Sequence, residues 1–247
     1  MSIIKPYARI YRPYTSATIV PLSVDDYLSD PLYANKEERE SLLSAARLIV
    51  QDVIRLFDFV EPCDDNFGVY SHRIYELFLR CSTEFETNCK GVLQANHYPK
   101  SVKNMRIKDY SKLNTAMRLS DYSISCDSWN TQRKFVPFED WKYGEALSWY
   151  QDYNIVKHNR ATEFPLANLG NLMMALCGLI VLLAAQFDQE IGKVSSSWFS
   201  FTLANMPNSF AILPFTVYRP AFTEEESYEF DWKSIKDEPD PVLYYSF

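Results

Sequence analysis

Apolar side chains recur at spacings of three and four residues in two long stretches, which is the pattern of helices that bury one face against a core. The first stretch covers residues 36–57 and stops before a cluster of turn-forming residues that begins at Pro62. The second covers residues 74–92 and ends at the turn-forming residues 97–100. We therefore expect two long helices that pack through their apolar faces.

The polar positions that follow predict two charged surfaces. In the second helix Glu76, Arg80 and Glu84 stand four apart, a spacing at which opposite charges pair along a helix. Residues 104–120 predict a short basic helix. The cations in and beside it are Lys103, Arg106, Lys108, Lys112 and Arg118. With Tyr110 and Tyr122 as stacking platforms, this surface would suit single-stranded RNA, and a solvated helix face is the alternative.

Two pairs of β-like runs predict hairpins. Residues 122–126 and 134–138 flank a turn-rich segment and predict a hairpin inserted into the helical part of the chain. Residues 198–203 and 210–218 flank a second turn-rich segment near the C-terminus. The β structure expected from these runs is small beside the helices.

The most apolar part of the chain follows the inserted hairpin. Helical periodicity resumes at Gly144, runs to about Arg160, pauses at Pro165 and continues over residues 166–187. Residues 172–185 are fourteen apolar or small residues in a row, whereas a helix needs about 20 to cross a membrane. We therefore expect a central helix that is buried on all sides of a bundle, and no membrane association.

Together these patterns predict a mainly α fold, a helical bundle with small β-hairpin appendages. The expected parts are an extended N-terminal arm over residues 1–36, a bundle over 37–195 with the hairpin inserted at about 121–140, and a C-terminal β-hairpin with an acidic tail over 196–247. The arm contains a β-like run at 18–22 and is expected to pack across the bundle.

Charge and composition narrow the classes of protein. The net charge is −7, and residues 221–247 carry −6 of it through eight acidic residues against two lysines. This tail is either a solvated terminus or a docking strip for a basic partner. The six glycines stand singly, which excludes the clustered glycines of dinucleotide-binding folds and P-loops. Five cysteines without a C-x-x-C pair, and a first segment without a secretory pattern, predict reduced thiols and a cytoplasmic location.

Candidate chemistry concentrates in residues 149–160. The chain has three histidines, none in a hydrolase or zinc motif, so we expect neither a metal nor another cofactor. At the helical angle per residue, Trp149, Tyr153 and Arg160 share one face, while Asn154 and His158 lie about 40° apart on an adjoining one. The segment therefore directs a polar cluster toward the bundle interior or toward a partner.

The cations of this segment allow two interpretations. Lys157, His158 and Arg160 form a compact set suited to a phosphate, and an imidazole can transfer protons near neutral pH. Alternatively, Lys157 and Arg160 only complement the dipole at the end of a helix, and His158 satisfies a carbonyl.

Residues 153–160, preceded by a helical bundle and followed by a long apolar helix, resemble the HEPN superfamily of prokaryotic proteins. Many of its members are RNases in toxin, abortive-infection and other antiviral systems. The family signature is an arginine, usually followed by a polar residue, with a histidine a few residues later. Asn154 and His158 match the polar residue and the histidine, whereas Tyr153 occupies the place of the arginine. The resemblance covers roughly residues 37–190.

The resemblance implies metal-independent RNA cleavage in a cleft shared by two subunits. His158 would then move the proton of the ribose 2′-hydroxyl, Asn154 would orient the site, and Arg160 or Lys157 would replace the missing arginine. Lys157, Tyr153 and Trp149 are the candidate ligand contacts.

Two functions remain as hypotheses. The first is a metal-independent endoribonuclease that works as a dimer. The second is a non-catalytic module of a prokaryotic defence or toxin-type system, which binds RNA, a nucleotide or a protein partner as a homodimer or as a subunit of a larger assembly. Tyr153 in the place of the arginine favours the non-catalytic module.

Overall fold

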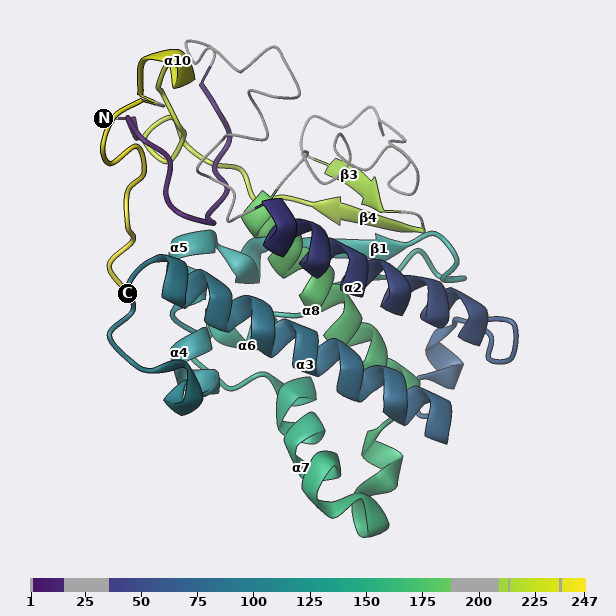
Figure 1. Ribbon diagram of the computed structural model, residues 1–247. Helices are drawn as coiled ribbons and strands as arrows, with labels where there is room; N and C mark the ends of the chain where they lie inside the picture. The colour runs from purple at the N-terminus through teal and green to yellow at the C-terminus, as the bar shows by residue number, and fades with distance from the viewer. Residues whose placement is uncertain (1, 16–35, 188–208, 213, 236) are drawn as a thin grey trace.

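The computed structural model of the chain describes residues 2–15, 36–187, 209–212, 214–235 and 237–247. The long helices are α2 (Lys36–Leu56), α3 (His72–Ala95), α7 (Ser148–Glu163) and α8 (Leu169–Phe187). Helix α8 runs through the middle, α2 and α3 pack against it, and α7 contacts both α3 and α8 (Figure 1). The fold is therefore mainly α with small β appendages, as the sequence predicts.

Helices α2 and α3 bury the faces that the apolar spacing predicts. The Ser71 side chain accepts a hydrogen bond from the backbone N–H of Ile74 at 3.2 Å and caps the start of α3. The buried apolar residues of α3 are Ile74, Leu77, Phe78, Cys81, Phe85, Cys89, Val92 and Leu93. Helix α3 packs against α2 and against α8. Apolar residues therefore recur regularly along its whole length.

The charge pairing predicted within α3 is wrong. Arg80 does not pair with Glu76 or Glu84; its Nη1 lies 2.6 Å from a carboxylate oxygen of Asp52 in α2. Arg73 reaches the other oxygen of Asp52 at 3.0 Å. The hydrogen bond from Arg80, together with the nearby cations, holds the pKa of Asp52 below its usual value. The arginines of α3 thus tie this helix to α2.

Helix α8 confirms the predicted central helix. By length and composition it could cross a membrane, but 89% of its apolar window is buried inside the protein, which is the burial of a core helix in a soluble protein. It begins at Leu169 and not near residue 166, because a 3-10 turn, η4 (Phe164–Leu166), precedes it. Helix α7 begins at Ser148 and not at Gly144, whose φ of 74° ends the preceding short helix.

Residues 104–120 form two short helices, so the single basic helix predicted there is wrong. These are α4 (Ile107–Tyr110) and α5 (Leu113–Met117). After α5, Arg118 adopts the left-handed conformation, with φ of 54°, and redirects the chain. The remaining short helices are η1 (Asp64–Asn66), η2 (Val102–Asn104), η3 (Leu119–Asp121), α6 (Glu139–Lys142) and α10 (Trp232–Ile235).

The inserted hairpin and the C-terminal hairpin join into one antiparallel sheet. Its strands are β1 (Ser123–Cys126), β2 (Lys134–Phe135), β3 (Ser209–Ile212) and β4 (Phe215–Tyr218). Their order in the sheet is β2-β1-β4-β3, with Ile124 opposite both Phe135 and Val217. The continuous run predicted over 210–218 is wrong, because the chain reverses between β3 and β4. The run at 198–203 lies outside the described residues.

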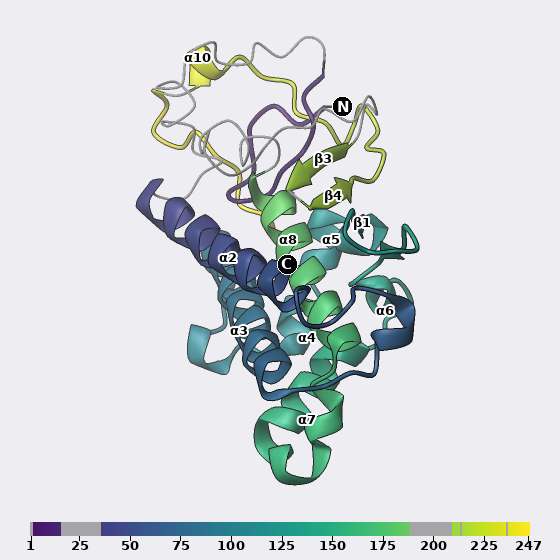
Figure 2. The same cartoon turned by 90° about the vertical axis from the view of Figure 1, so that its right-hand side faces the viewer.

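The N-terminal arm packs across one end of the bundle together with the C-terminal segment (Figure 1 and Figure 2). Tyr228 is fully buried, and its hydroxyl donates to the backbone oxygen of Ile10 at 2.6 Å. Arg9 is 3% exposed and donates from Nε and Nη2 to Oε1 of Gln186 in α8, at 3.0 and 2.7 Å. The β-like run at 18–22 lies outside the described residues.

The acidic tail is held against the protein, so it is not simply a solvated terminus. Glu226 pairs with Arg118 at 3.1 Å, and Glu238 pairs with Lys5 at 2.5 Å. Glu229 is exposed and lies between these contacts in the chain. A docking role for the exposed acids stays a prediction.

Candidate functional site

The first half of α7 belongs to the core. Trp149, Tyr153 and Val156 are 1%, 1% and 0% exposed. The indole Nε1 of Trp149 donates to the backbone oxygen of Pro137 at 2.9 Å, and its ring lies 5.2 Å from that of Phe85 in α3. Trp149 is therefore a packing residue and does not present a surface to an outside ligand.

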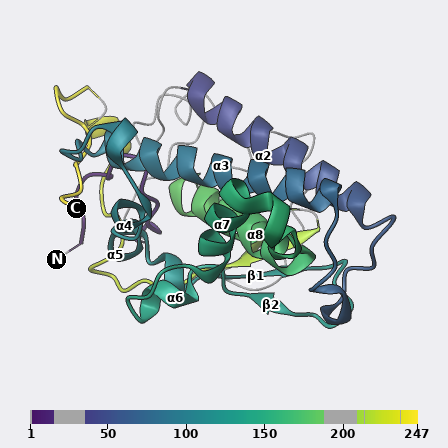
Figure 3. The ribbon, with the colours of Figure 1, turned by 90° about the horizontal axis from the view of Figure 1, so that it is seen from below.

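The second half of α7 leaves the bundle. Asn159 has φ of −126° and ψ of 38°, so the helix is broken there. Residues 157–162 are exposed, and η4 turns the chain back toward α8. Figure 1 and Figure 2 show this end of α7 projecting from the bundle, and in Figure 3, seen from below, α7 lies in front of α8 and next to α3. Arg160 was predicted to share the face of Trp149, but the break removes it from that face.

Tyr153 connects the two halves through Lys157. The Lys157 ammonium donates to the hydroxyl oxygen of Tyr153 at 2.9 Å and lies 4.9 Å from the centre of its ring. This hydrogen bond raises the pKa of Lys157 above its ordinary value, so deprotonation of the cation needs a higher pH than for a free lysine. Tyr153 therefore holds the neighbouring cation Lys157 in position. Asn154 donates to the backbone oxygen of Tyr150 at 3.1 Å, which leaves its side-chain oxygen free to accept.

His158 and Arg160 are both presented to solvent. The His158 ring is exposed and makes no hydrogen bond within the described part of the chain. His158 therefore does not donate to a described backbone carbonyl, which was the structural alternative. The Arg160 guanidinium carbon lies 5.8 Å from the ring centre of Tyr75 and 6.0 Å from that of Phe164. Across the described ranges Arg160 has no carboxylate partner, so its charge is available to an anion.

Arg160 lies beside two rings of an aromatic group, and we call the group and Arg160 together the cation–aromatic cluster: Arg160, Phe164, Tyr70, His72 and Tyr75. The Phe164 ring centre lies 5.4 Å from that of Tyr70, 4.9 Å from that of His72 and 6.0 Å from that of Tyr75. Tyr70 is 48% exposed. Sequence reasoning missed this cluster, because it joins the start of α3 to η4 across a long separation in the chain.

The basic surface predicted around residues 104–120 has no exposed rings at Tyr110 and Tyr122. Tyr110 and Tyr122 are each 1% exposed and belong to the core. Arg118 is committed to Asp121 and Glu226, at 3.0 and 3.1 Å. Lys103, Arg106, Lys108 and Lys112 remain exposed. Cations without exposed rings fit a solvated face better than a single-stranded RNA groove.

The described residues offer no candidate site for cysteine or metal chemistry. All five cysteines are free and buried, as the sequence predicts, and burial raises the pKa of the Cys126 thiol to about 11. Within the same residues no group of three His, Cys, Asp or Glu side chains could hold a metal ion.

Comparison with known proteins gives no relative. No family model matches the chain, and neither a curated protein nor a solved structure matches it. The candidate site therefore stands on its own geometry.

Proposed function

We propose that this protein is a HEPN-like, non-catalytic module of a prokaryotic defence or toxin-type system, and that it binds single-stranded RNA at the projecting end of α7. One observation carries the proposal: Lys157 and Arg160 are exposed cations, and the Arg160 guanidinium lies 5.8 and 6.0 Å from the half-buried rings of Tyr75 and Phe164 in the cation–aromatic cluster. The lineage rests on the match of Asn154 and His158 to the family pattern. A cytoplasmic location and a homodimer or larger assembly belong to the same proposal.

The chemistry of single-stranded RNA explains why these groups would act together. Cations neutralise the phosphates, and aromatic side chains stack with unpaired bases. Arg160 and Lys157 supply the charge, and Tyr70 and His72 supply exposed rings that contact Phe164, whose ring centre lies 6.0 Å from the Arg160 guanidinium carbon. A phosphate bound at Arg160 would thus place its base within reach of a stacking surface. The chain as a whole carries −7, so binding depends on this local arrangement and not on net charge.

Fluorescence anisotropy with a labelled single-stranded RNA tests the proposal. We expect Arg160→Ala and Tyr70→Ala each to weaken binding by about 1 kcal/mol or more, roughly fivefold. Lys233→Ala is the matched control, because Lys233 is an exposed cation on α10. Undiminished binding by both site variants, or equal loss in the control, would refute the site.

A metal-independent endoribonuclease is the second candidate, favoured by the exposure of His158 next to Arg160 in the chain. In this case His158 would move the ribose 2′-hydroxyl proton, with Arg160 or Lys157 steadying the phosphate. Incubation with tRNA or total RNA in EDTA, beside His158→Ala, tests it. Cleavage by the unmodified protein alone would support this function, and cleavage by both or by neither removes His158 as a catalytic residue.

A further inference from the structure

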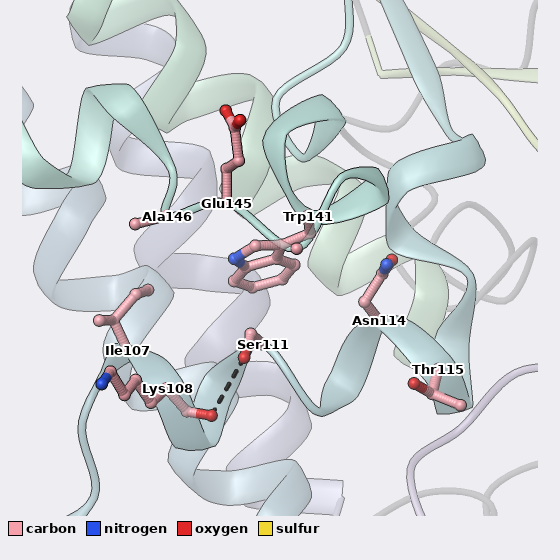
Figure 4. Close-up of a pocket in the computed structure, with 9 residues that line it drawn as sticks. Ile107, Lys108, Ser111, Asn114, Thr115, Trp141, Glu145 and Ala146 are labelled. Atoms are coloured by element: carbon pink, nitrogen blue, oxygen red, sulfur yellow. Dashed lines mark hydrogen bonds between the residues drawn. The ribbon is translucent and has the colours of Figure 1, made fainter.

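A separate cavity of about 310 Å³ lies between α4–α5 and the loop that precedes α7. Its wall on one side is Ile107 and Lys108 with Asn114, and on the other Glu145 and Ala146. Trp141 of α6 lies at the centre of the residues drawn in Figure 4. We call this cavity the Trp141 pocket. Its volume is that of a small organic ligand.

The indole N–H of Trp141 is the feature that points to a ligand. The structure describes the side chains of Trp129, Trp141 and Trp149, and two of them donate to protein oxygens: Trp129 to Asp64 at 2.8 Å and Trp149 to Pro137 at 2.9 Å. Trp141 is 7% exposed, yet its Nε1 has no acceptor among the described residues. The nitrogen is not sealed from solvent, so it is open to an acceptor that enters the pocket.

The Trp141 pocket has room for an acceptor of this N–H. One face of the Trp141 ring is stacked on Phe138, with ring centres 5.0 Å apart and 22° between the planes. Figure 4 shows the indole nitrogen directed into the space between Ala146 and Ile107. An occupant of this space would meet a hydrogen-bond donor at its edge and aliphatic side chains on either side.

The polar groups of the pocket add further constraints. The side-chain oxygen of Asn114 accepts from the backbone N–H of Ser120 at 2.8 Å, and its amide N–H groups have no acceptor in the described part of the chain. Lys108 and Glu145 are exposed at the rim and carry opposite charges, which cancel. The pocket thus presents donors inside and no net charge, which disfavours a bare phosphate and favours a neutral ring with acceptors in its plane.

We propose that the Trp141 pocket binds a nucleobase. An acceptor atom on the base edge takes the indole N–H of Trp141, and Ile107 and Ala146 lie on either side of the base. Flat slots of this kind, with apolar walls and donors at the edge, are how proteins hold an unstacked base. The base belongs either to a free nucleoside or nucleotide or to a bound RNA strand. The inference goes beyond RNA binding at α7, because a free nucleoside tests it without RNA.

The experiment uses the full chain and two readouts. Isothermal titration calorimetry tests the free ligands, which are adenosine, guanosine, cytidine, uridine and their 5′-monophosphates. Fluorescence anisotropy with labelled single-stranded RNA tests the strand. Trp141→Phe deletes the N–H and keeps a ring. Trp129→Phe is the matched control, since it also loses an indole N–H but outside the pocket. Ala146→Leu, which fills the space in front of the indole nitrogen at an exposed position, is a second test should Trp141→Phe lower the melting temperature.

The outcomes separate the two sources of the base. Binding of a nucleoside or nucleotide that falls at least about fivefold in Trp141→Phe, and not in Trp129→Phe, identifies a free ligand. The same loss seen only with RNA identifies a base of the strand. If neither class of ligand is weakened by Trp141→Phe or Ala146→Leu, the inference is overturned, and Arg160→Ala still decides RNA binding at α7 independently.

Discussion

The two halves of α7 differ in what their side chains serve. In the first half Trp149 and Tyr153 are 1% exposed and fill the space between α3 and α8. In the second half Lys157, His158 and Arg160 face solvent. One continuous polar and aromatic segment therefore contains both core residues and surface residues. The change from buried to exposed is visible only in the three-dimensional structure. A residue's place in a motif does not by itself say whether it is available to a ligand.

The boundary has two physical causes. Asn159 departs from helical dihedrals, which breaks the periodicity that would have returned Arg160 to the buried face. Pro165 then lies in the 3-10 turn that reverses the chain into α8. Changes on either side of Asn159 should consequently act on different properties.

The largest expected effect lies in the buried half. Trp149→Ala should lower the free energy of unfolding by about 3–5 kcal/mol, because it leaves a cavity beside Phe85 and unpairs the Pro137 oxygen. Tyr143→Ala, at a site 70% exposed, should change it by less than about 0.5 kcal/mol. Urea unfolding followed by circular dichroism measures both. A loss below about 1 kcal/mol in Trp149→Ala would mean that this half is not core.

The exposed half should show the reverse behaviour. The double variant Lys157→Ala, Arg160→Ala should weaken RNA binding roughly tenfold or more and flatten the dependence of log K on log salt by about 1.4. Its free energy of unfolding should stay within about 0.5 kcal/mol of the original. Anisotropy over a salt series, with Lys233→Ala as control, gives the slope. An unaltered slope would show that neither cation contacts phosphate.

Tyr153→Phe tests the link between the halves. The ring remains in the core, but the acceptor for the exposed Lys157 ammonium is lost, so stability should fall by about 0.5 kcal/mol. RNA affinity should fall roughly twofold as Lys157 becomes less ordered. Tyr143→Phe removes an exposed hydroxyl and serves as the control. Identical stability and affinity in Tyr153→Phe and Tyr143→Phe would mean that Tyr153 does not position Lys157.

The smallest effect is a dependence on alkaline pH. The pKa of Lys157 is raised in the folded protein, so its contribution to stability is complete below its unfolded pKa of about 10.4 and is lost as pH rises through the folded pKa. The stability difference between the original protein and Lys157→Met should therefore be a few tenths of a kcal/mol and should shrink only above about pH 10.4. Urea unfolding at pH 8–11.5 measures it, and a difference that is constant throughout would contradict the raised pKa.

The sequence was sufficient for features that depend on local periodicity. The helices α2, α3 and α8 follow from repeating apolar positions. The buried cysteines follow from their apolar surroundings. Each of these depends on residues that are near neighbours in the chain. The burial of Trp149 and Tyr153 was not predicted, because the sequence suggested both as ligand contacts.

Features that depend on distant contacts were not predictable. The cation–aromatic cluster forms only because η4 returns to the start of α3, and nothing near Tyr70 in the chain indicates Phe164. Tyr110 looked like a surface platform because its neighbours are basic, although packing against Phe85 places it in the core. The acidic tail looked solvated, although Glu226 meets Arg118. In each case the partner lies far away in the sequence.

The position of β1 between β2 and β4 has a consequence for biosynthesis. Cys126 pairs with Phe215, so β1 lacks one of its neighbours until the chain has been made that far. At about 5–20 residues per second, the ribosome leaves that strand edge open for roughly 4–18 s. A nascent or truncated chain that ends before Phe215 therefore offers an unpaired β edge, and such chains should need protection by chaperones that full-length protein does not.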